Sequence, residues 1–211
     1  MVVKSKSSSK SIGFCIPSRA LVHSRTMQDV IACSNGYNVN WYFSHGNPIP
    51  DCFNIIVEEA VRDKNDYIFI VEDDMKLPHD ILKKLLSANV DIALADYPVK
   101  KDKHTVAWSA KGEFLYGGVG CVLIKFKVFK IKLTPPYFRT DYGYTLDMEQ
   151  VSPMGNHGLQ DVDFYQQCKW ANCSIAVIDT PVGHYYLKEP KLPKYGNKTA
   201  LEYVVEDWEF K

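Results

Sequence analysis

Three features that mark common protein classes are missing from this sequence. No apolar run approaches the roughly 20 residues of a membrane-spanning helix, and residues 1–10, rich in Lys and Ser, lack the apolar segment of a secretory signal. A surplus of positive charge is also missing, since 25 Lys and Arg residues balance 25 Asp and Glu residues. Proteins that bind nucleic acids or anionic membranes usually carry such a surplus. We therefore expect no membrane segment and no nucleic-acid partner, although a local basic patch is compatible with this balance.

The glycine and cysteine motifs of several familiar sites are absent as well. The sequence contains neither GxGxxG nor GxxxxGK[ST], so dinucleotide-binding and P-loop sites lack their key glycines. None of the six cysteines forms a CxxC pair. Several lie inside apolar runs, as Cys15 and Cys121 do, and this is typical of reduced thiols in a core. The pattern predicts a cytoplasmic protein whose thiols are not paired in disulfides.

What the sequence does contain is a regular alternation of expected strands and helices. Its 211 residues, 46% of them hydrophobic, suffice for one globular domain over residues 11–211 behind a flexible leader of residues 1–10. Apolar runs predict strands over residues 11–16, 39–43, 67–71, 90–95 and 174–178, and helices over 26–33, 52–62, 78–86, 160–171 and, in the tail, 200–207. Asp51 is expected to cap the second helix. This order predicts an α/β fold in which helices flank a mixed, mostly parallel sheet.

Two further segments stand out by their composition. Residues 114–125 contain Gly117, Gly118 and Gly120 inside an apolar run, which indicates that the backbone comes close to another group there. Residues 134–158 are rich in proline, glycine and tyrosine and predict a long loop. Loops of that length in a compact domain are usually functional or disordered.

Three consecutive carboxylates, Glu72, Asp73 and Asp74, follow the apolar run of residues 67–71. A run without polar alternation is typical of a strand buried on both faces, and such a strand delivers the acids to the carboxyl edge of the sheet. Open α/β folds bind their ligands at this edge. The acids repel one another unless a cation or a proton relieves them, so a divalent cation completed by phosphate oxygens is one interpretation. The alternative is a solvated acidic turn before a helix.

Three more groups contain residue types that can carry chemistry. Asp161 and Asp163 stand two residues apart at the start of a helix, so they face different sides and are expected to have different roles. The alternative is that one of them is simply the helix N-cap. His184 follows the last strand, and a lone histidine is more often structural than a metal ligand. Pro17-Ser18-Arg19 follow the first strand, at the edge where a nucleotide lies in a doubly wound fold.

Taken in this order, the segments resemble the GT-A-type glycosyltransferases, which use nucleotide sugars and carry a DxD-type metal motif. Glu72-Asp73-Asp74 match that motif, and Val182-Gly183-His184 match the late metal-binding histidine. Residues 54–60 match the helix that faces the nucleotide, and residues 91–98 match the strand and loop that follow the metal motif. Residues 116–124 match the glycine-rich segment beside the sugar, and residues 160–164 match the Glu-Asp-x-Asp segment. The resemblance spans about residues 11–185. It departs at Glu72, in place of Asp, and at Gln160, in place of Glu, which puts more weight on Asp161.

The resemblance implies a single GT-A domain with a Rossmann-like sheet. Its nucleotide-binding half would cover residues 11–98, its acceptor and sugar half residues 99–190, and its tail residues 191–211. Asp74 and His184 would bind Mn²⁺ or Mg²⁺, and a histidine ligand favours Mn²⁺. Asp161 would act beside the anomeric carbon, as a general base in an inverting reaction or as a nucleophile or stabilising charge in a retaining one, with Asp163 in reserve. Glu72 would contact the metal or the ribose. The residues implied to bind the donor are Pro17, Ser18, Arg19, Asn54, Glu72, Asp73 and Gly118.

The implied function is transfer of a hexose or deoxyhexose from a UDP-sugar to a glycan or glycoprotein. Within the family, the chain resembles the N-terminal domain of larger chlorella-virus glycosyltransferases that are implicated in glycosylating a major capsid protein. That likeness implies a longer multidomain chain, viral capsid glycans as the acceptor and the host-cell cytoplasm as the location. Two alternatives stay open. A nucleotidyltransferase also places carboxylates at a strand end to hold Mg²⁺. A non-catalytic carbohydrate-binding or capsid-interaction module would use Tyr137, Tyr142 and Tyr144 as a stacking surface.

Overall fold

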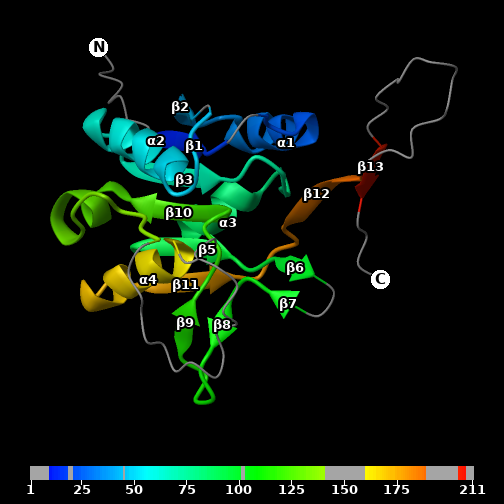
Figure 1. Cartoon of the computed structure of the whole chain (residues 1–211). Helices are drawn as coiled ribbons and strands as arrows, with labels where there is room; N and C mark the ends of the chain where they lie inside the picture. The colour runs from blue at the N-terminus through cyan, green and yellow to red at the C-terminus, as the bar shows by residue number, and fades with distance from the viewer. Residues whose placement is uncertain are drawn as a thin grey trace, which may run out of the picture.

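A six-stranded sheet forms the centre of the protein (Figure 1). The structure is a computed structural model that describes residues 10–18, 21–44, 46–100, 103–140, 160–188 and 204–207. The strands lie in the order β11-β5-β10-β3-β1-β2, and only β10 runs antiparallel to its neighbours. Their bounds are β1 Ser11–Ile16, β2 Asn38–Phe43, β3 Tyr67–Val71, β5 Ile92–Ala95, β10 Cys121–Lys125 and β11 Ile175–Ile178. The predicted α/β fold with a mixed, mostly parallel sheet is therefore confirmed.

The central strand β3 is buried on both faces, as its uninterrupted apolar sequence predicts. All five of its residues are at most 7% exposed. Ile68 and Ile70 enter one core, whereas Tyr67, Phe69 and Val71 enter the other. Successive side chains of a strand point to opposite faces, so a strand between two cores must be apolar at every position.

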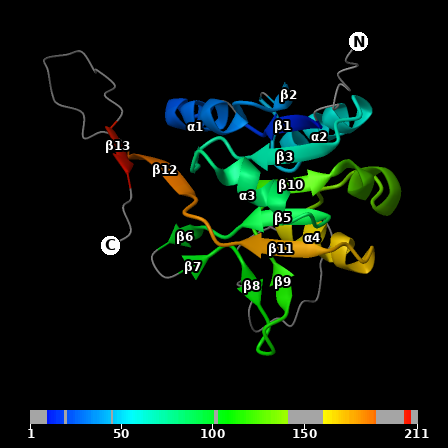
Figure 2. The same ribbon diagram turned by 180° about the vertical axis from the view of Figure 1, so that it is seen from behind.

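Two layers of helices supply these cores, one on each face of the sheet (Figures 1 and 2). One face is covered by α1 (Ser24–Ser34) and α3 (Ile81–Ser87), whose buried residues share a core with Phe69. The other is covered by α2 (Asp51–Arg62), the π-helical turn η1 (Val128–Lys132) and α4 (Gln160–Trp170), which pack around Ile70. With both faces covered, the edges of the sheet are left as the places where polar side chains can gather.

Short strands extend the fold at the carboxyl edge. β4 (Met75–Lys76) pairs with β12 (Gly183–Lys188), which pairs in turn with β13 (Val204–Asp207). Two antiparallel hairpins join β5 to β10: β6 (Pro98–Lys100) with β7 (Lys103–His104), and β8 (Ala107–Trp108) with β9 (Phe114–Tyr116). The β8–β9 hairpin projects from the body of the protein (Figure 1).

Most of the predicted elements are confirmed, with two corrections. The helix expected over residues 200–207 is wrong, because residues 204–207 form β13. The Val204-Val205 pair favours an extended strand, and β12 offers the partner that a strand needs. Asp51 is the first residue of α2 rather than its cap, since Pro50 holds the N-cap position. The leader over residues 1–9, the loop over 141–158 and most of the tail lie outside the described residues.

Candidate active site

The acidic turn after β3 is held against the glycine-rich segment before β10. The backbone N–H of Glu72 donates to the carbonyl oxygen of Gly120 (3.0 Å), and the N–H of Met75 donates back to the carbonyl of Glu72 (3.3 Å). A Cβ atom on Gly120 would lie 2.7 Å from Oε2 of Glu72. Position 120 must therefore be glycine for the Glu72 carboxylate to lie where it does, as the apolar run with inserted glycines predicts.

His184 reaches this turn from β12. Its backbone pairs with Met75 of β4 in an antiparallel bridge, which places the imidazole beside the acids. The ring nitrogen Nδ1 lies 3.2 Å from the carbonyl oxygen of Pro98. Because a carbonyl oxygen only accepts, Nδ1 carries the proton in this bond and the lone pair is on Nε2. Metal-binding histidines are commonly oriented by such a bond.

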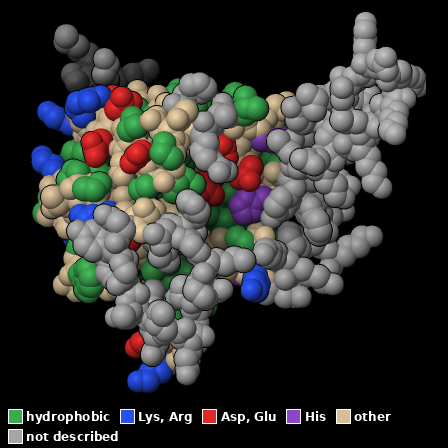
Figure 3. Space-filling view, in the orientation of Figure 1, with side chains coloured by type: hydrophobic (Ala, Val, Ile, Leu, Met, Phe, Trp, Pro, Cys, Tyr) green, Lys and Arg blue, Asp and Glu red, His purple; other side chains and the backbone are tan. Residues whose placement is uncertain are grey.

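Glu72, Asp74 and His184 together form a group that could hold a metal ion. One ligand atom from each lies within 4.8 Å of the others, and all three side chains are partly buried. Two carboxylate oxygens and one imidazole nitrogen suit a divalent cation, and the nitrogen favours Mn²⁺ over Mg²⁺. The structure thus brings together the three residues expected to bind the metal. Acidic and histidine side chains lie next to each other on the face shown in Figure 3.

Tyr97 lies against His184 of this group and close to Asp161, the candidate catalytic residue. It is 2% exposed, and its hydroxyl accepts a hydrogen bond from the N–H of Gly120 (2.9 Å). Its ring packs edge-on against His184, with 5.0 Å between ring centroids. Burial raises the pKa of Tyr97 well above its usual value, and the nearby charges of Glu72 and Asp161 raise it further. Sequence reasoning missed this residue because a tyrosine after a strand gives no signal beyond ordinary packing.

Asp161 is a half-buried carboxylic acid in the first turn of α4, and its Oδ1 atom is buried. Its Oδ1 has no hydrogen-bond partner among the described residues. Burial raises its pKa to about 7, and the nearby N–H of Val119 acts in the opposite direction. A buried polar atom without a partner is costly, so it marks either strain or a place for a ligand. Next to a metal-binding group, the second explanation fits the chemistry.

Asp163 faces a different environment, as the spacing from Asp161 predicts. It is 1% exposed and accepts a hydrogen bond from the side chain of Gln167, whose amide also donates to the carbonyl oxygen of Tyr137 (3.1 Å). These contacts support a structural role, and a catalytic role for Asp163 stays a prediction. Tyr137 is 3% exposed, so it offers little surface for a sugar, while Tyr142 and Tyr144 lie outside the described residues.

The expected nucleotide-binding residues are in two places. Pro17 and Ser18 follow β1 at the same edge as the acids, where the N–H of Ser18 donates to Oγ of Ser44 (2.8 Å). Arg19 lies outside the described residues. Asn54 is occupied by structural bonds, since its amide nitrogen donates to the carbonyl of Phe138 (2.9 Å) and its oxygen accepts from the N–H of the same residue (3.0 Å). Nucleotide contacts by these residues stay predictions.

Asp73 and Gly118 contribute through their backbones. The carbonyl oxygen of Asp73 accepts from the N–H of His23 (2.8 Å), which fixes the acidic turn to the start of α1. The carbonyl of Gly118 accepts from the hydroxyl of Tyr165 (3.2 Å). A Cβ atom on Gly118 would collide with the Tyr97 hydroxyl. Both residues therefore shape the site, and their contacts with a donor stay predictions.

Tyr185 fastens β12 to the body of the protein. Its N–H donates to the carbonyl of Asp74 (2.6 Å), and its hydroxyl donates to Oδ2 of Asp29 (2.9 Å) on α1. Its ring stacks on that of His23, with 4.9 Å between centroids. Since β12 pairs with β4 through only two residues, these contacts help to keep the adjacent His184 in place. Nothing in the local sequence predicted this role.

The comparisons with known proteins concern the fold. No protein-family model matches the sequence, and no curated protein does. Among solved structures, A197 from STIV is similar, with a TM-score of 0.56 and 14% identity over 96% of each chain. A provisionally assigned nucleotide-diphospho-sugar transferase from Desulfovibrio desulfuricans G20 has a TM-score of 0.43 and 9% identity over 80% of this chain and 78% of the other. A provisionally assigned glucose-1-phosphate thymidylyltransferase from Bacillus anthracis has a TM-score of 0.39 and 10% identity over 82% and 88%. The first likeness shows a shared fold, and the weaker two carry no inference.

Proposed function

We propose that the protein is a metal-dependent glycosyltransferase that transfers a hexose or deoxyhexose from a UDP-sugar to a glycan or glycoprotein. The observation that carries the proposal is that a group of possible metal ligands and the carboxylate of Asp161 lie at the same edge of the sheet. Glu72, Asp74 and His184 offer three metal ligands within 4.8 Å of one another. Asp161 lies close enough for its charge and that of Glu72 to act on the same tyrosine, Tyr97.

The metal-binding group would hold the diphosphate of the donor. A divalent cation bound there would neutralise the charge that builds up on the departing nucleoside diphosphate. The chain's own contribution is to fix the ligands: Pro98 sets the histidine tautomer through Nδ1, and Gly120 positions the Glu72 carboxylate. Pre-organised ligands lose little free energy of ordering when the cation and its phosphates arrive.

Asp161 would act on the sugar-transfer step itself. With a pKa of about 7, its carboxyl is substantially deprotonated near neutral pH and can still take up a proton. In an inverting reaction, Oδ1 would accept the proton of the acceptor hydroxyl as that oxygen attacks the anomeric carbon. In a retaining reaction, the same carboxylate would stabilise the positive charge at that carbon. Both courses require an oxygen without another partner, and among the described residues Oδ1 has none.

The acceptor and location that we propose rest on the resemblance given above. The acceptor would be a glycan of a viral capsid protein, made in the host-cell cytoplasm by a longer chain of which these residues form one domain. The six free cysteines are consistent with a reducing compartment. Among the described residues, no helix has both the length and the apolar character needed to cross a membrane.

Calorimetric titration of UDP, with and without Mn²⁺, tests the proposal. We expect binding that requires the metal, followed by transfer or slow hydrolysis when UDP-sugars replace UDP. Release of pyrophosphate from a nucleoside triphosphate and a sugar phosphate would instead indicate a nucleotidyltransferase. Absence of binding with UDP, GDP and CDP, in the presence and absence of Mn²⁺, would overturn the enzymatic assignment and favour a binding module.

A further inference from the structure

The C-terminal end of α4 brings two cysteines together. The N–H of Cys173 donates to the carbonyl oxygen of Cys168 (2.9 Å), and the N–H of Asn172 donates to that of Lys169 (3.0 Å). Asn172 has a left-handed backbone with φ of 51°. These two bonds and the left-handed residue define a Schellman motif, in which the side chains at the positions of Cys168 and Cys173 lie against each other. Each of the two thiols accordingly affects the pKa of the other.

The two thiols differ in exposure and surroundings. Cys173 is partly exposed, whereas the other five cysteines are buried. Lys132 donates from Nζ to the carbonyl of Asn172 (3.0 Å), which places its positive charge beside the Cys173 turn. The neighbouring Cys168 thiol and the charge of Lys132 lower the pKa of Cys173, although burial opposes them. A partly exposed thiol with a lowered pKa beside a second thiol is the usual arrangement of a redox-sensitive pair.

The remaining thiols lack these properties. Burial raises the pKa of Cys15, Cys33, Cys52, Cys121 and Cys168. A thiol that is buried and protonated reacts slowly, because the thiolate is the nucleophile. Reaction with a small oxidant should therefore begin at Cys173.

We propose that Cys173 and Cys168 form a redox-active pair that closes into an intramolecular disulfide by exchange with a small oxidised thiol such as glutathione disulfide. The Cys173 thiolate attacks one sulfur of that disulfide, and one glutathione leaves as a thiolate that takes up a proton. Cys168 then loses its proton and attacks the Cys173 sulfur, and the second glutathione leaves. The protein dithiol is oxidised by two electrons, and one disulfide is reduced to two thiols.

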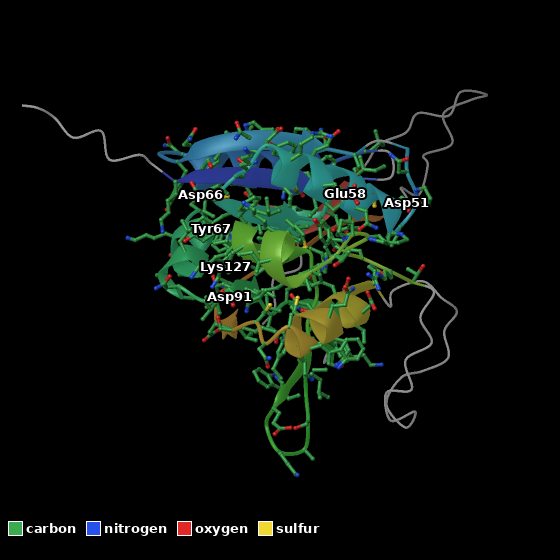
Figure 4. All side chains as sticks on the ribbon, turned by 90° about the vertical axis from the view of Figure 1, so that its left-hand side faces the viewer. Asp51, Glu58, Asp66, Tyr67, Asp91 and Lys127 are labelled. Atoms are coloured by element: carbon green, nitrogen blue, oxygen red, sulfur yellow. The ribbon has the colours of Figure 1, made fainter. Side chains whose placement is uncertain are left out.

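The new bond would join the end of α4 to the loop before β11. This region lies at the amino edge of the sheet, where Asp91 and Lys127 are seen next to each other in Figure 4. The candidate active site is at the opposite edge, so the modification does not depend on the proposed function. It would still act on α4, whose first turn carries Asp161.

Oxidation of the folded, reduced protein by glutathione disulfide tests the proposal. We expect the wild-type chain to lose two of its six thiols without forming disulfide-linked dimers, with a mass lower by two hydrogens. Lys169 lies between the two cysteines, so trypsin separates them and a disulfide would link the two resulting peptides. This mapping uses the wild-type protein and does not depend on whether a variant folds. Thiol loss at other cysteines, or formation of disulfide-linked dimers instead, would refute the pair.

Three variants separate the two steps of the exchange. Cys168→Ala should stop after the first step and accumulate a glutathione adduct at Cys173. Cys173→Ser should gain no adduct and lose no thiols. Cys121→Ser, which removes a buried thiol elsewhere, should still lose two thiols as the wild type does. Absence of the adduct in a folded Cys168→Ala variant, with circular dichroism matching the wild type, would contradict the assignment of Cys173 as the attacking thiol.

Discussion

The carboxylates at the two edges of the central sheet have opposite surroundings. At the amino edge, Asp91 accepts from Lys127 (2.6 Å) and Lys132 (3.0 Å), and its Oδ2 also accepts from the N–H of Ser174 (3.3 Å). Burial opposes ionisation of Asp91, but these hydrogen bonds prevail and hold its pKa well below its usual range. This carboxylate is ionised, paired and structural.

At the carboxyl edge, carboxylates are gathered beside one another instead. Glu72 and Asp74 lie within 4.8 Å of each other, and Asp161 has a raised pKa and a buried oxygen without a described partner. Such an arrangement costs stability in the absence of a ligand and becomes favourable when a cation or a proton arrives. The number of carboxylates therefore says little about function, whereas the groups that surround each carboxylate are informative.

The largest expected effect comes from removing the charge of Asp161. Asp161→Asn should lower the turnover of a UDP-sugar by roughly 10²–10⁴-fold, because the amide cannot accept the acceptor proton. Binding of UDP with Mn²⁺, measured by calorimetry, should remain close to that of the wild type. Asp163→Asn, two residues further along α4, should keep most of the turnover. The opposite ranking of the two variants would move the catalytic role to Asp163.

Removal of a metal ligand should abolish metal-dependent binding. Asp74→Ala is expected to weaken UDP binding in the presence of Mn²⁺ by about 100-fold or more, since the loss of a direct ligand exceeds the usual effect of a supporting residue. Asp80→Ala is a suitable control, because this acid pairs with Lys84 and lies outside the metal-binding group. Equal affinities of Asp74→Ala and wild type would exclude the metal assignment.

Asp91 should matter for stability and not for binding. Asp91→Asn is expected to lower the free energy of unfolding by about 1–2 kcal/mol, a range reduced for the exposure of Lys127. Because the pKa of Asp91 is depressed in the folded state, its contribution is present above the usual value of 3.8 and is lost as the pH falls through the folded value. Urea unfolding at pH 7 and near pH 2 measures this. A variant as stable as the wild type at pH 7 would show that the two lysines contribute nothing.

In the absence of metal, the ionisation of Asp161 should lower the stability of the fold, whereas that of Asp91 raises it. The folded pKa of Asp161, about 7, lies above the usual 3.8, so the wild type loses stability as the pH rises from about 4 through about 7. Asp161→Asn removes this loss and should raise the melting temperature at pH 8 by several degrees in EDTA, with little difference near pH 4. A lower melting temperature for the variant at pH 8 would mean that the ionised carboxylate is stabilised within the fold.

The smallest effect is expected from the residue that fastens β12. Tyr185→Phe keeps the ring stacked on His23 but loses the bond to Asp29, so Mn²⁺ affinity should fall by about 5- to 10-fold, the equivalent of one hydrogen bond of ~1 kcal/mol. Tyr67→Phe loses a comparable bond with Lys10 at the amino edge and should leave Mn²⁺ affinity unchanged. If both variants bind alike, Tyr185 has no part in holding His184.

The features that the sequence predicts well are those encoded by neighbouring residues. The apolar run before Glu72 places three acids at a sheet edge, and inserted glycines at 118 and 120 indicate close backbone contacts that the structure confirms. By contrast, the approach of His184 to Glu72 depends on a bridge between β12 and β4, which are far apart in the sequence. Only the family resemblance connected them.

Other features could not be predicted because their signals are shared with ordinary cores. A buried Tyr97 or a side-chain amide such as that of Asn54 has many uses, and the partner that decides among them comes from elsewhere in the chain. The sequence around the two valines before Glu206 is compatible with a helix, and only the pairing with β12 determines that it forms a strand. The contact between Cys168 and Cys173 was not predicted either, because it follows from the left-handed backbone of Asn172 at the end of α4.

The glycines before β10 also determine how this chain can diverge over evolution. A Cβ atom on Gly120 would lie 2.5 Å from the Tyr97 hydroxyl, so even alanine would displace either the tyrosine or Glu72. Descendants that keep the site must therefore keep this glycine together with its tyrosine, however much their surfaces change. At 14% identity to a protein of the same fold, overall similarity is a poor guide to ancestry. The paired presence of this tyrosine and glycine offers a more selective criterion for finding relatives that share the site.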